Sequence, residues 1–267
     1  MNDHEEVAFG IHSGLKAVGE SDAILNACRS QKRREIVLHA FDRAYRQFAN
    51  EHVLDTYVFC LSELRADDND GLLSMWRGYG GNGSGIAWVI NTGQFAAVQT
   101  SSLILARVHY GSRNERIAWL ATKVAQFSNL LLSEELGDDD LNMATNALFE
   151  RIKLFALFSK HKGFEEEREW RVVYTPARDP GGALQPYFGY FVGPRGVEPK
   201  LKLKLQPISG VTAPVFSLDL ITDRLILGPT LSSPLAVSAF HKLLDGTKHP
   251  GLKARLHASG IPFRDRT

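Results

Sequence analysis

The chain is poor in cysteine and lacks the usual metal-binding motifs. Two cysteines among 267 residues, Cys28 and Cys60, are too few for the disulfide framework of a secreted domain. Cys60 lies in an apolar run at 57–61, so we expect a buried, unreactive thiol. No HExxH or CxxC spacing occurs, and the nine histidines are scattered. The sequence therefore predicts no bound metal and fits a reducing compartment.

Long apolar runs and an excess of charge of one sign are also absent. No apolar run approaches the roughly 20 residues that cross a bilayer. The first residues are polar and acidic, unlike a signal peptide. The 31 basic and 30 acidic residues give a formal net charge of +1, so the total charge does not demand nucleic acid or an anionic membrane. We expect a soluble, cytoplasmic protein with no membrane partner.

The composition is that of an ordinary folded protein. Hydrophobic residues make up 44% of the chain and charged residues 23%. A chain of this length buries a substantial core. There is no internal repeat or low-complexity tract, and the Pro/Gly-rich stretch at 176–186 is interpreted as a surface loop rather than a linker. We therefore expect a single domain over residues 1–267.

Helical patterns fill the first fifty residues and the middle of the chain. Ser21 and Asp22 are suited to cap a helix over 23–28. Apolar residues at four-residue spacing indicate a second helix over 33–50. Further helices are expected at 115–132, 141–158 and 234–244.

Short runs of β-branched and aromatic residues predict strands on both sides of the helical middle. We expect these strands to share one sheet. The pattern predicts an α+β fold with a mixed or antiparallel sheet core and a central helical insertion. The expected strands are 56–61, 86–91, 103–110, 169–174, 189–192, 200–205, 225–227 and 261–263.

The acidic segment before the expected strand at 169–174 is the first candidate site. If the backbone is extended there, the carboxylates of Glu167 and Glu169 point to one face and Arg168 to the other. Two close carboxylates repel, which raises one pKa and suits acid–base or hydrogen-bonding chemistry. The alternative is a solvated strand end in which one glutamate pairs with Arg171. The sequence leaves both interpretations open.

A second candidate combines aromatic rings, a cation and glycines within residues 74–85. Trp76, Arg77 and Tyr79 lie beside a glycine run, and glycine lets the backbone approach a ligand closely. The run lacks the Gly-Lys-Ser/Thr of a P-loop and the strand-to-helix setting of dinucleotide-binding glycines. A hairpin, or a stop at a helix C-terminus, explains the glycines equally well.

Two basic segments have an ordinary structural explanation beside a phosphate-binding one. Residues 160–162 are expected to form a basic helix C-terminus, favourable to the helix dipole. The cations of the first helices are expected to line a solvated face, with a phosphate or nucleic-acid contact as the alternative. These cations are Arg29, Lys32, Arg33, Arg34, Arg43 and Arg46.

Several motifs together resemble the bacterial family known as domain of unknown function 2971. They run through nearly the whole chain in the family's order. The family usually begins with a strand carrying a Tyr-His-Tyr-like motif upstream of Asn-Asp. Because this sequence starts at Met1-Asn2-Asp3, we expect that strand, and any ligand-binding histidine on it, to be missing. The resembling segments are 2–6, 59–63, 73–80, 85–87, 162–171, 225–229 and 259–264.

The layout is similar, more loosely, to the ADP-ribosyltransferase superfamily, which places a Ser or Tyr on one strand and Glu-x-Glu on a later one. Ser62 matches the first of these positions and Glu167-Arg168-Glu169 the second. This resemblance implies an ADP-ribosyltransferase-like enzyme of toxin or phage-defence type that cleaves the glycosidic bond of NAD. Its acceptor is left open as a protein or a nucleic acid.

The same resemblance implies roles for single residues. Glu169 becomes the catalytic carboxylate, Glu167 its helper, and Ser62 the group that positions the nicotinamide ribose. The other implied substrate-binding residues are Trp76, Arg77, Tyr79 and Arg171.

Two other functions stay open. One is an inactive fold kept as a binding or regulatory module, in which Glu169→Gln leaves ligand binding unchanged. The other is a nucleic-acid-processing enzyme that uses the acids at 165–169 with a divalent metal. The first predicts no NAD turnover, and the second predicts magnesium-dependent activity that NAD does not affect.

Overall fold

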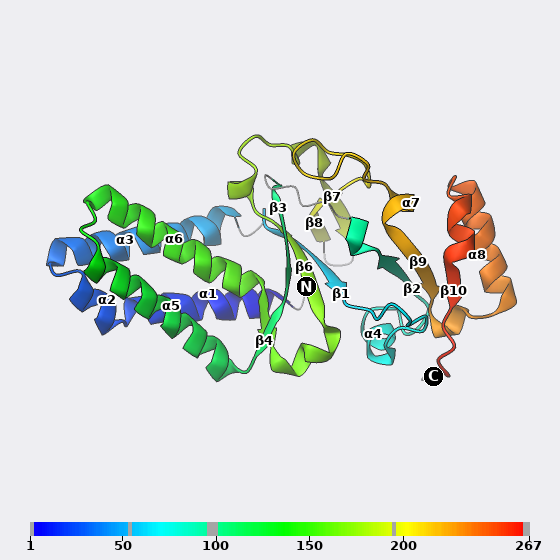
Figure 1. Ribbon diagram of the computed structural model, residues 1–267, viewed down its shortest axis with the longest axis horizontal. Helices are drawn as coiled ribbons and strands as arrows, with labels where there is room; N and C mark the ends of the chain where they lie inside the picture. The colour runs from blue at the N-terminus through cyan, green and yellow to red at the C-terminus, as the bar shows by residue number, and fades with distance from the viewer. Residues whose placement is uncertain (1–2, 53–54, 95–100, 194–195, 264–267) are drawn as a thin grey trace. The chain divides into compact units, whose positions relative to one another are not determined.

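The computed structural model describes residues 3–52, 55–94, 101–193 and 196–263 (Figure 1). Asn2 and Arg264, which belong to the motifs quoted above, lie outside these residues. The chain divides into two compact units, each assembled from two separate segments. The expected single domain stays a prediction. Unit 1 comprises Met1–Ser62 and Leu103–Arg178, and unit 2 comprises Glu63–Ser102 and Asp179–Thr267.

Helices make up most of unit 1 and confirm the helices expected in the first fifty residues and in the middle. Serine side chains cap the N-termini of three of these helices. Ser21 accepts a hydrogen bond from the backbone N–H of Ile24 at 3.2 Å, and Ser112 forms a capping box with Glu115. The helices are α1 (Asp3–Gly19), α2 (Asp22–Ala27), α3 (Gln31–Gln47), the π-helix η1 (Phe48–His52), α5 (Arg113–Ser133) and α6 (Asp138–Leu157).

The large apolar core of unit 1 lies among these helices. Phe41 of α3 meets Phe149 of α6 edge to face, with ring centroids 5.5 Å apart. Gly14 lets α1 approach α6 closely, because a Cβ there would lie 2.3 Å from Ile152 Cγ2. The expected α+β class is confirmed, with small antiparallel and mixed sheets. The expected sheet core is corrected in one respect, because the main apolar cluster lies among amphipathic helices.

Unit 1 also contains a three-stranded antiparallel sheet in the order β1-β6-β3. A separate parallel pair joins β4 to β5. Because α5 and α6 connect β4 to β5, the expected central helical insertion is confirmed. The strands are β1 (Tyr57–Ser62), β3 (Leu103–Arg107), β4 (His109–Gly111), β5 (Ser159–His161) and β6 (Glu169–Tyr174).

The single strand expected at 103–110 is wrong, because the chain changes partner at Val108. This residue is buried, and its N–H donates to the carbonyl of Glu169 at 2.8 Å. β3 ends before it on β6, and β4 continues beyond it on β5. The strand at 56–61 was expected to be buried, but Phe59 of β1 is 55% exposed because one face of the sheet is open.

Unit 2 is built around a second three-stranded sheet, β10-β9-β2, and a two-stranded hairpin, β7-β8. β9 pairs antiparallel with β2 and parallel with β10. The helices and strands are α4 (Leu73–Gly78), β2 (Ile86–Ile90), β7 (Phe188–Gly193), β8 (Gly196–Leu201), α7 (Leu218–Ile221), β9 (Thr222–Leu227), α8 (Pro234–Gly246) and β10 (Leu256–Ala258). The 3-10 helices of the two units are η2 (Thr92–Gln94), η3 (Lys162–Glu167), η4 (Pro176–Arg178), η5 (Gln185–Tyr187), η6 (Pro229–Leu231) and η7 (Pro250–Arg255).

Three expectations about the strands are corrected here. The strands do not share one sheet, since the described residues form four separate ones. The strand expected at 200–205 ends at Leu201, because β8 pairs with β7 only from Gly196 to there. The strand expected at 261–263 lies earlier, at Leu256–Ala258, where the chain runs alongside β9.

None of the helices in the described parts of the chain combines the length and the apolar character needed to cross a membrane.

Candidate functional site

A buried ion pair on β6 is the centre of the candidate site. Glu169 and Arg171 lie two residues apart on one face of the strand. Arg171 donates from Nε to Glu169 Oε1 at 2.7 Å and from NH2 to Oε2 at 3.3 Å. A third hydrogen bond runs from NH1 of Arg171 to the carbonyl of Leu157 at 2.6 Å. Glu169 is 4% exposed and Arg171 is fully buried, so the pair is part of the interior.

Lys160 of β5 brings a second carboxylate to this pair. Its Nζ donates to Glu169 Oε2 at 3.1 Å and to Glu167 Oε2 at 2.5 Å. Lys160 is 5% exposed. Two cations therefore face two carboxylates in a largely buried cluster of no net charge, with Glu167 partly exposed. We call Lys160, Glu167, Glu169 and Arg171 the charge cluster.

The electrostatics of the cluster favour the ionised form of Glu169. Burial alone raises the pKa of this carboxyl. Hydrogen bonds from Arg171, Cys60 and Lys160, together with the charge of Arg171, outweigh burial and lower the pKa of Glu169 below its ordinary value. The expectation that repulsion between neighbouring carboxylates raises a pKa here is wrong for Glu169, because cations lie between the two acids.

Two hydroxyl groups border the cluster. The backbone N–H of Glu169 donates to Oη of Tyr110, on β4, at 2.8 Å. Burial, followed by the negative charges of Glu169 and Glu167, raises the pKa of the Tyr110 phenol, so this hydroxyl keeps its proton. Ser62 is the register partner of Glu169 in the β1–β6 ladder, and its Oγ donates to the carbonyl of Glu167.

The backbone around Arg168 differs from the extended geometry expected. Glu167 ends the 3-10 helix η3, and Arg168 adopts the left-handed conformation with φ of 43° before β6 begins at Glu169. The expected alternation of side chains is therefore wrong at this point. The two carboxylates still converge, because both bind Lys160. The pairing of Glu169 with Arg171, the alternative left open by the sequence, is confirmed.

Trp76, Arg77 and Tyr79 belong to unit 2, whereas the charge cluster belongs to unit 1. Trp76 is 4% exposed, and its indole N–H donates to the carbonyl of Asp70 at 2.7 Å. Arg77 lies over the ring of Phe263 at 5.9 Å, and Tyr79 is 66% exposed. The substrate-binding roles of these three residues stay predictions.

The glycine run has a structural function in unit 2. It follows the C-terminus of α4, which confirms the helix-stop interpretation. Gly80 lies against the Trp76 ring, where an added Cβ would be 2.6 Å from Cε3. Gly83 has a φ of +89°, a conformation that side chains rarely adopt. The glycines therefore let the loop fold back over Trp76.

Two expectations about single residues are corrected. Cys60 is exposed rather than buried, because it lies near the end of β1. The segment at 160–162 does not end a helix, since α6 stops at Leu157 and Lys160 lies on β5. The cations of the first helices make contacts within unit 1. Arg33 donates a hydrogen bond to the carbonyl of Leu136 at 2.6 Å, and Arg34 donates one to the carbonyl of Leu25 at 2.7 Å.

Sequence reasoning missed Lys160 and Tyr110 as members of the site. Both are polar residues on three-residue strands that pair with each other in register. The available signal was a lysine followed shortly by an acidic run, but a parallel pair of such short strands has no recognisable sequence pattern. Within the described residues, no group of three or more His, Cys, Asp and Glu side chains is arranged to hold a metal ion.

Comparison with known protein families gives a match to one part of the chain. Residues 75–172 match the family described as "Protein of unknown function (DUF2971)", and this match supports the family resemblance. The matched stretch includes the whole charge cluster together with Trp76, Arg77 and Tyr79, but not Ser62. No curated protein and no solved structure matches the chain.

Proposed function

We propose that unit 1 is a non-catalytic binding module for a nicotinamide nucleotide, with its binding edge at the rim of the charge cluster. One observation carries this proposal. Both carboxylate oxygens of Glu169 are already hydrogen-bonded to buried cations. The resemblance to NAD-using proteins supports the choice of nucleotide, and this geometry supports the absence of turnover.

A carboxylate that stabilises charge on the ribose during glycosidic cleavage must contact the ribose. The side chain of Glu169 is 5% exposed, and Arg171 holds it from two nitrogens. Releasing it would break a buried ion pair, which costs about 3–5 kcal/mol when one partner is lost. We therefore assign Glu169 to the stability of the fold.

The rim of the cluster offers groups that a nucleotide can reach. Phe164 is 44% exposed, and its ring centroid lies 4.9 Å from Nζ of Lys160. An exposed ring of this kind stacks on a base or on nicotinamide. Glu167 has 16% of its side chain exposed, and Ser62 is exposed beside it, so both can hydrogen-bond ribose hydroxyls.

Titration calorimetry with NAD tests the binding module. Phe164→Ala should weaken binding at least about fivefold, because stacking on a base is worth about 1–3 kcal/mol. Glu167→Gln should weaken it less. Glu165→Gln is the matched control, since Glu165 is an exposed acid of the same 3-10 helix outside the cluster. If NAD does not bind, or if Phe164→Ala binds as the unchanged protein does, the proposal fails.

A second candidate is the ADP-ribosyltransferase-like enzyme, of toxin or phage-defence type, with NAD as its substrate. It is favoured by the register that places Ser62 directly opposite Glu169, and by the lowered pKa of Glu169, which keeps the carboxylate charged. This candidate predicts nicotinamide release that Glu169→Gln abolishes and Glu165→Gln retains.

A further inference from the structure

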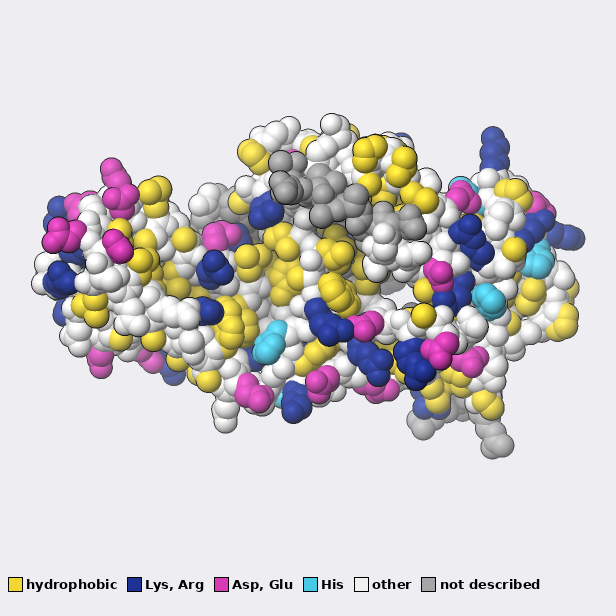
Figure 2. Space-filling model, in the orientation of Figure 1, with side chains coloured by type: hydrophobic (Ala, Val, Ile, Leu, Met, Phe, Trp, Pro, Cys, Tyr) yellow, Lys and Arg dark blue, Asp and Glu magenta, His cyan; other side chains and the backbone are white. Residues whose placement is uncertain are grey.

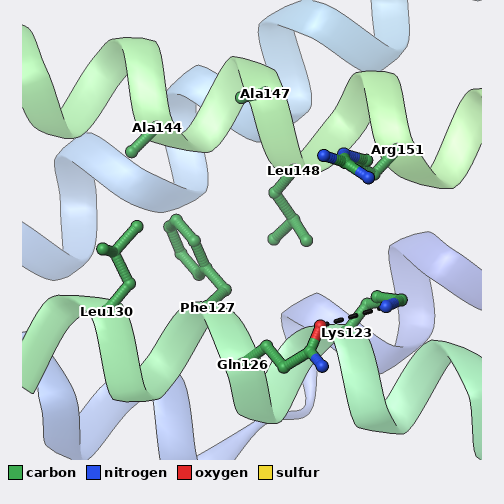
Figure 3. Close-up of a pocket in the computed structure, with 8 residues that line it drawn as sticks. All are labelled: Lys123, Gln126, Phe127, Leu130, Ala144, Ala147, Leu148 and Arg151. Atoms are coloured by element: carbon green, nitrogen blue, oxygen red, sulfur yellow. Dashed lines mark hydrogen bonds between the residues drawn. The ribbon is translucent and has the colours of Figure 1, made fainter.

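An open groove lies between helices α5 and α6 on the surface of unit 1. The groove has a volume of about 310 Å³ and lies away from the charge cluster. Hydrophobic side chains show between the two helices in the space-filling view (Figure 2). Figure 3 shows Phe127, Leu130, Ala144 and Leu148 at the apolar part of the groove and Lys123 and Arg151 at its other end.

Part of the apolar lining of the groove is exposed. Leu130 is 41% exposed, whereas Phe127 and Leu148, which also line the groove, are each 6% exposed. Met143 of α6, outside the lining, is 64% exposed. The small side chains of Ala144 and Ala147 allow another helix to approach α6 closely. Because the groove is open along its length, it suits the face of another helical pair better than an enclosed small molecule.

Charges mark the two ends of this groove with opposite signs. On α5, Lys123 begins a stripe of residues that continues through Phe127 and Leu130, and Glu134 follows directly after the helix as its C-cap residue, in extended backbone. Lys123 donates a hydrogen bond to Gln126 at 3.0 Å. Glu134 is exposed and forms no ion pair with the described residues. The stripe therefore runs from a cation toward an anion.

On α6 the anion comes before the cation in the chain, the reverse of the order on α5. The groove therefore has one basic end and one acidic end. Asp140 begins the stripe that passes Ala144 and Ala147 and ends at Arg151. Asp140 and Arg151 are exposed and likewise form no ion pair within the described chain. Asp140 and Arg151 lie eleven residues, or about 16 Å, apart along α6. Lys123 and Glu134 are also eleven residues apart in the chain, but Glu134 lies just beyond the end of α5.

We propose that the α5–α6 face binds a second copy of this chain in a two-fold symmetric dimer. The two-fold axis lies in the plane of the interface and runs perpendicular to the helices. It places α5 antiparallel to the partner's α5, and α6 antiparallel to the partner's α6. Arg151 then faces Asp140 of the other copy, and Lys123 lies toward the end of the partner's α5 that is followed by Glu134. The two pairs between Arg151 and Asp140 form together because both residues lie on the continuous helix α6.

Sedimentation equilibrium over a wide range of protein concentration tests this proposal. The unchanged chain should be a dimer. Arg151→Glu should raise the dissociation constant at least about tenfold, since each dimer then exchanges two attractive pairs for two repulsive ones. Lys16→Glu is the matched control, because Lys16 is an exposed lysine of α1 in the same unit.

The sharpest test is rescue by the opposite reversal. Asp140→Arg alone should weaken the dimer as Arg151→Glu does, and the double variant should regain most of the original affinity. Thermal unfolding of each variant separates weakened association from unfolding. A chain that stays monomeric at all concentrations overturns the proposal. The proposal is also overturned if neither charge reversal changes the dissociation constant of the dimer. It is likewise overturned if the double variant does not regain affinity.

Discussion

Glu169 and Arg171 occupy alternate positions on β6, and their side chains form a two-point ion pair in the interior of unit 1. The guanidinium uses its third nitrogen to bind the carbonyl of Leu157, at the end of α6. The pair therefore links the strand to the helical insertion. This link explains why both residues are buried although both are charged.

Replacing Arg171 should destabilise the protein strongly. Arg171→Met leaves Glu169 buried without its main partner, and breaking a buried pair from one side costs about 3–5 kcal/mol. Urea unfolding measures the change. Arg178→Met is the control, because Arg178 is exposed at the end of η4, and a surface change of this kind stays within about 0.5 kcal/mol. Equal losses in the two variants would contradict the assignment.

Stability should fall in acid because of Glu169. Its pKa is lower in the folded protein than in the unfolded chain. The stabilisation is thus complete above the unfolded value of about 4.3 and disappears as the pH falls through the lower folded value. The free energy of unfolding, measured from pH 7 to pH 2, should decrease less steeply in Glu169→Gln than in the unchanged protein. Parallel profiles would show that Glu169 is not the titrating group.

Two neighbouring glycines of unit 2 should respond differently to a methyl group. Gly80→Ala places a Cβ 2.6 Å from the Trp76 ring and should cost about 1–3 kcal/mol by overpacking. Gly78→Ala, with no atom within 4 Å of the added Cβ, should cost little or stabilise the end of α4. Chemical denaturation followed by tryptophan fluorescence compares them. Equal free energies of unfolding for Gly80→Ala and Gly78→Ala would contradict the close packing of the loop on Trp76.

The two cysteines should react at very different rates. Cys60 is exposed, whereas Cys28 is buried and burial raises the pKa of its thiol against the opposing charges of Arg33 and Arg34. A disulfide reagent at pH 8 should modify one thiol rapidly and the second only on unfolding. Cys60→Ser should remove the rapid phase. Two rapid phases in the native protein would contradict the burial of Cys28.

Local patterns in the sequence were enough to predict most helices and the β6 strand. The helix cap at Ser21 and the four-residue spacing of α3 are local features, and the structure confirms both. The strand at 169–174 was predicted with its observed ends, because its β-branched and aromatic run is bounded on both sides.

What the sequence could not supply depends on partners distant in the chain. Lys160 enters the site only because β5 pairs with β4 across the whole helical insertion. The break at Val108 follows from its bond to Glu169, some sixty residues later. The acidic run suggested a functional site, but only the structure shows that cations occupy both oxygens of Glu169.

We propose that Glu169 is committed to the fold and that unit 1 binds a nicotinamide nucleotide without cleaving it. This proposal is tested by nicotinamide release from NAD, measured for the unchanged chain, Ser62→Ala and Glu169→Gln under conditions where calorimetry shows bound NAD. We predict bound nucleotide and no release above the level of Glu169→Gln. Release by the unchanged chain that Ser62→Ala reduces and Glu169→Gln abolishes, with all three proteins folded, would contradict the claim and establish the transferase-like enzyme.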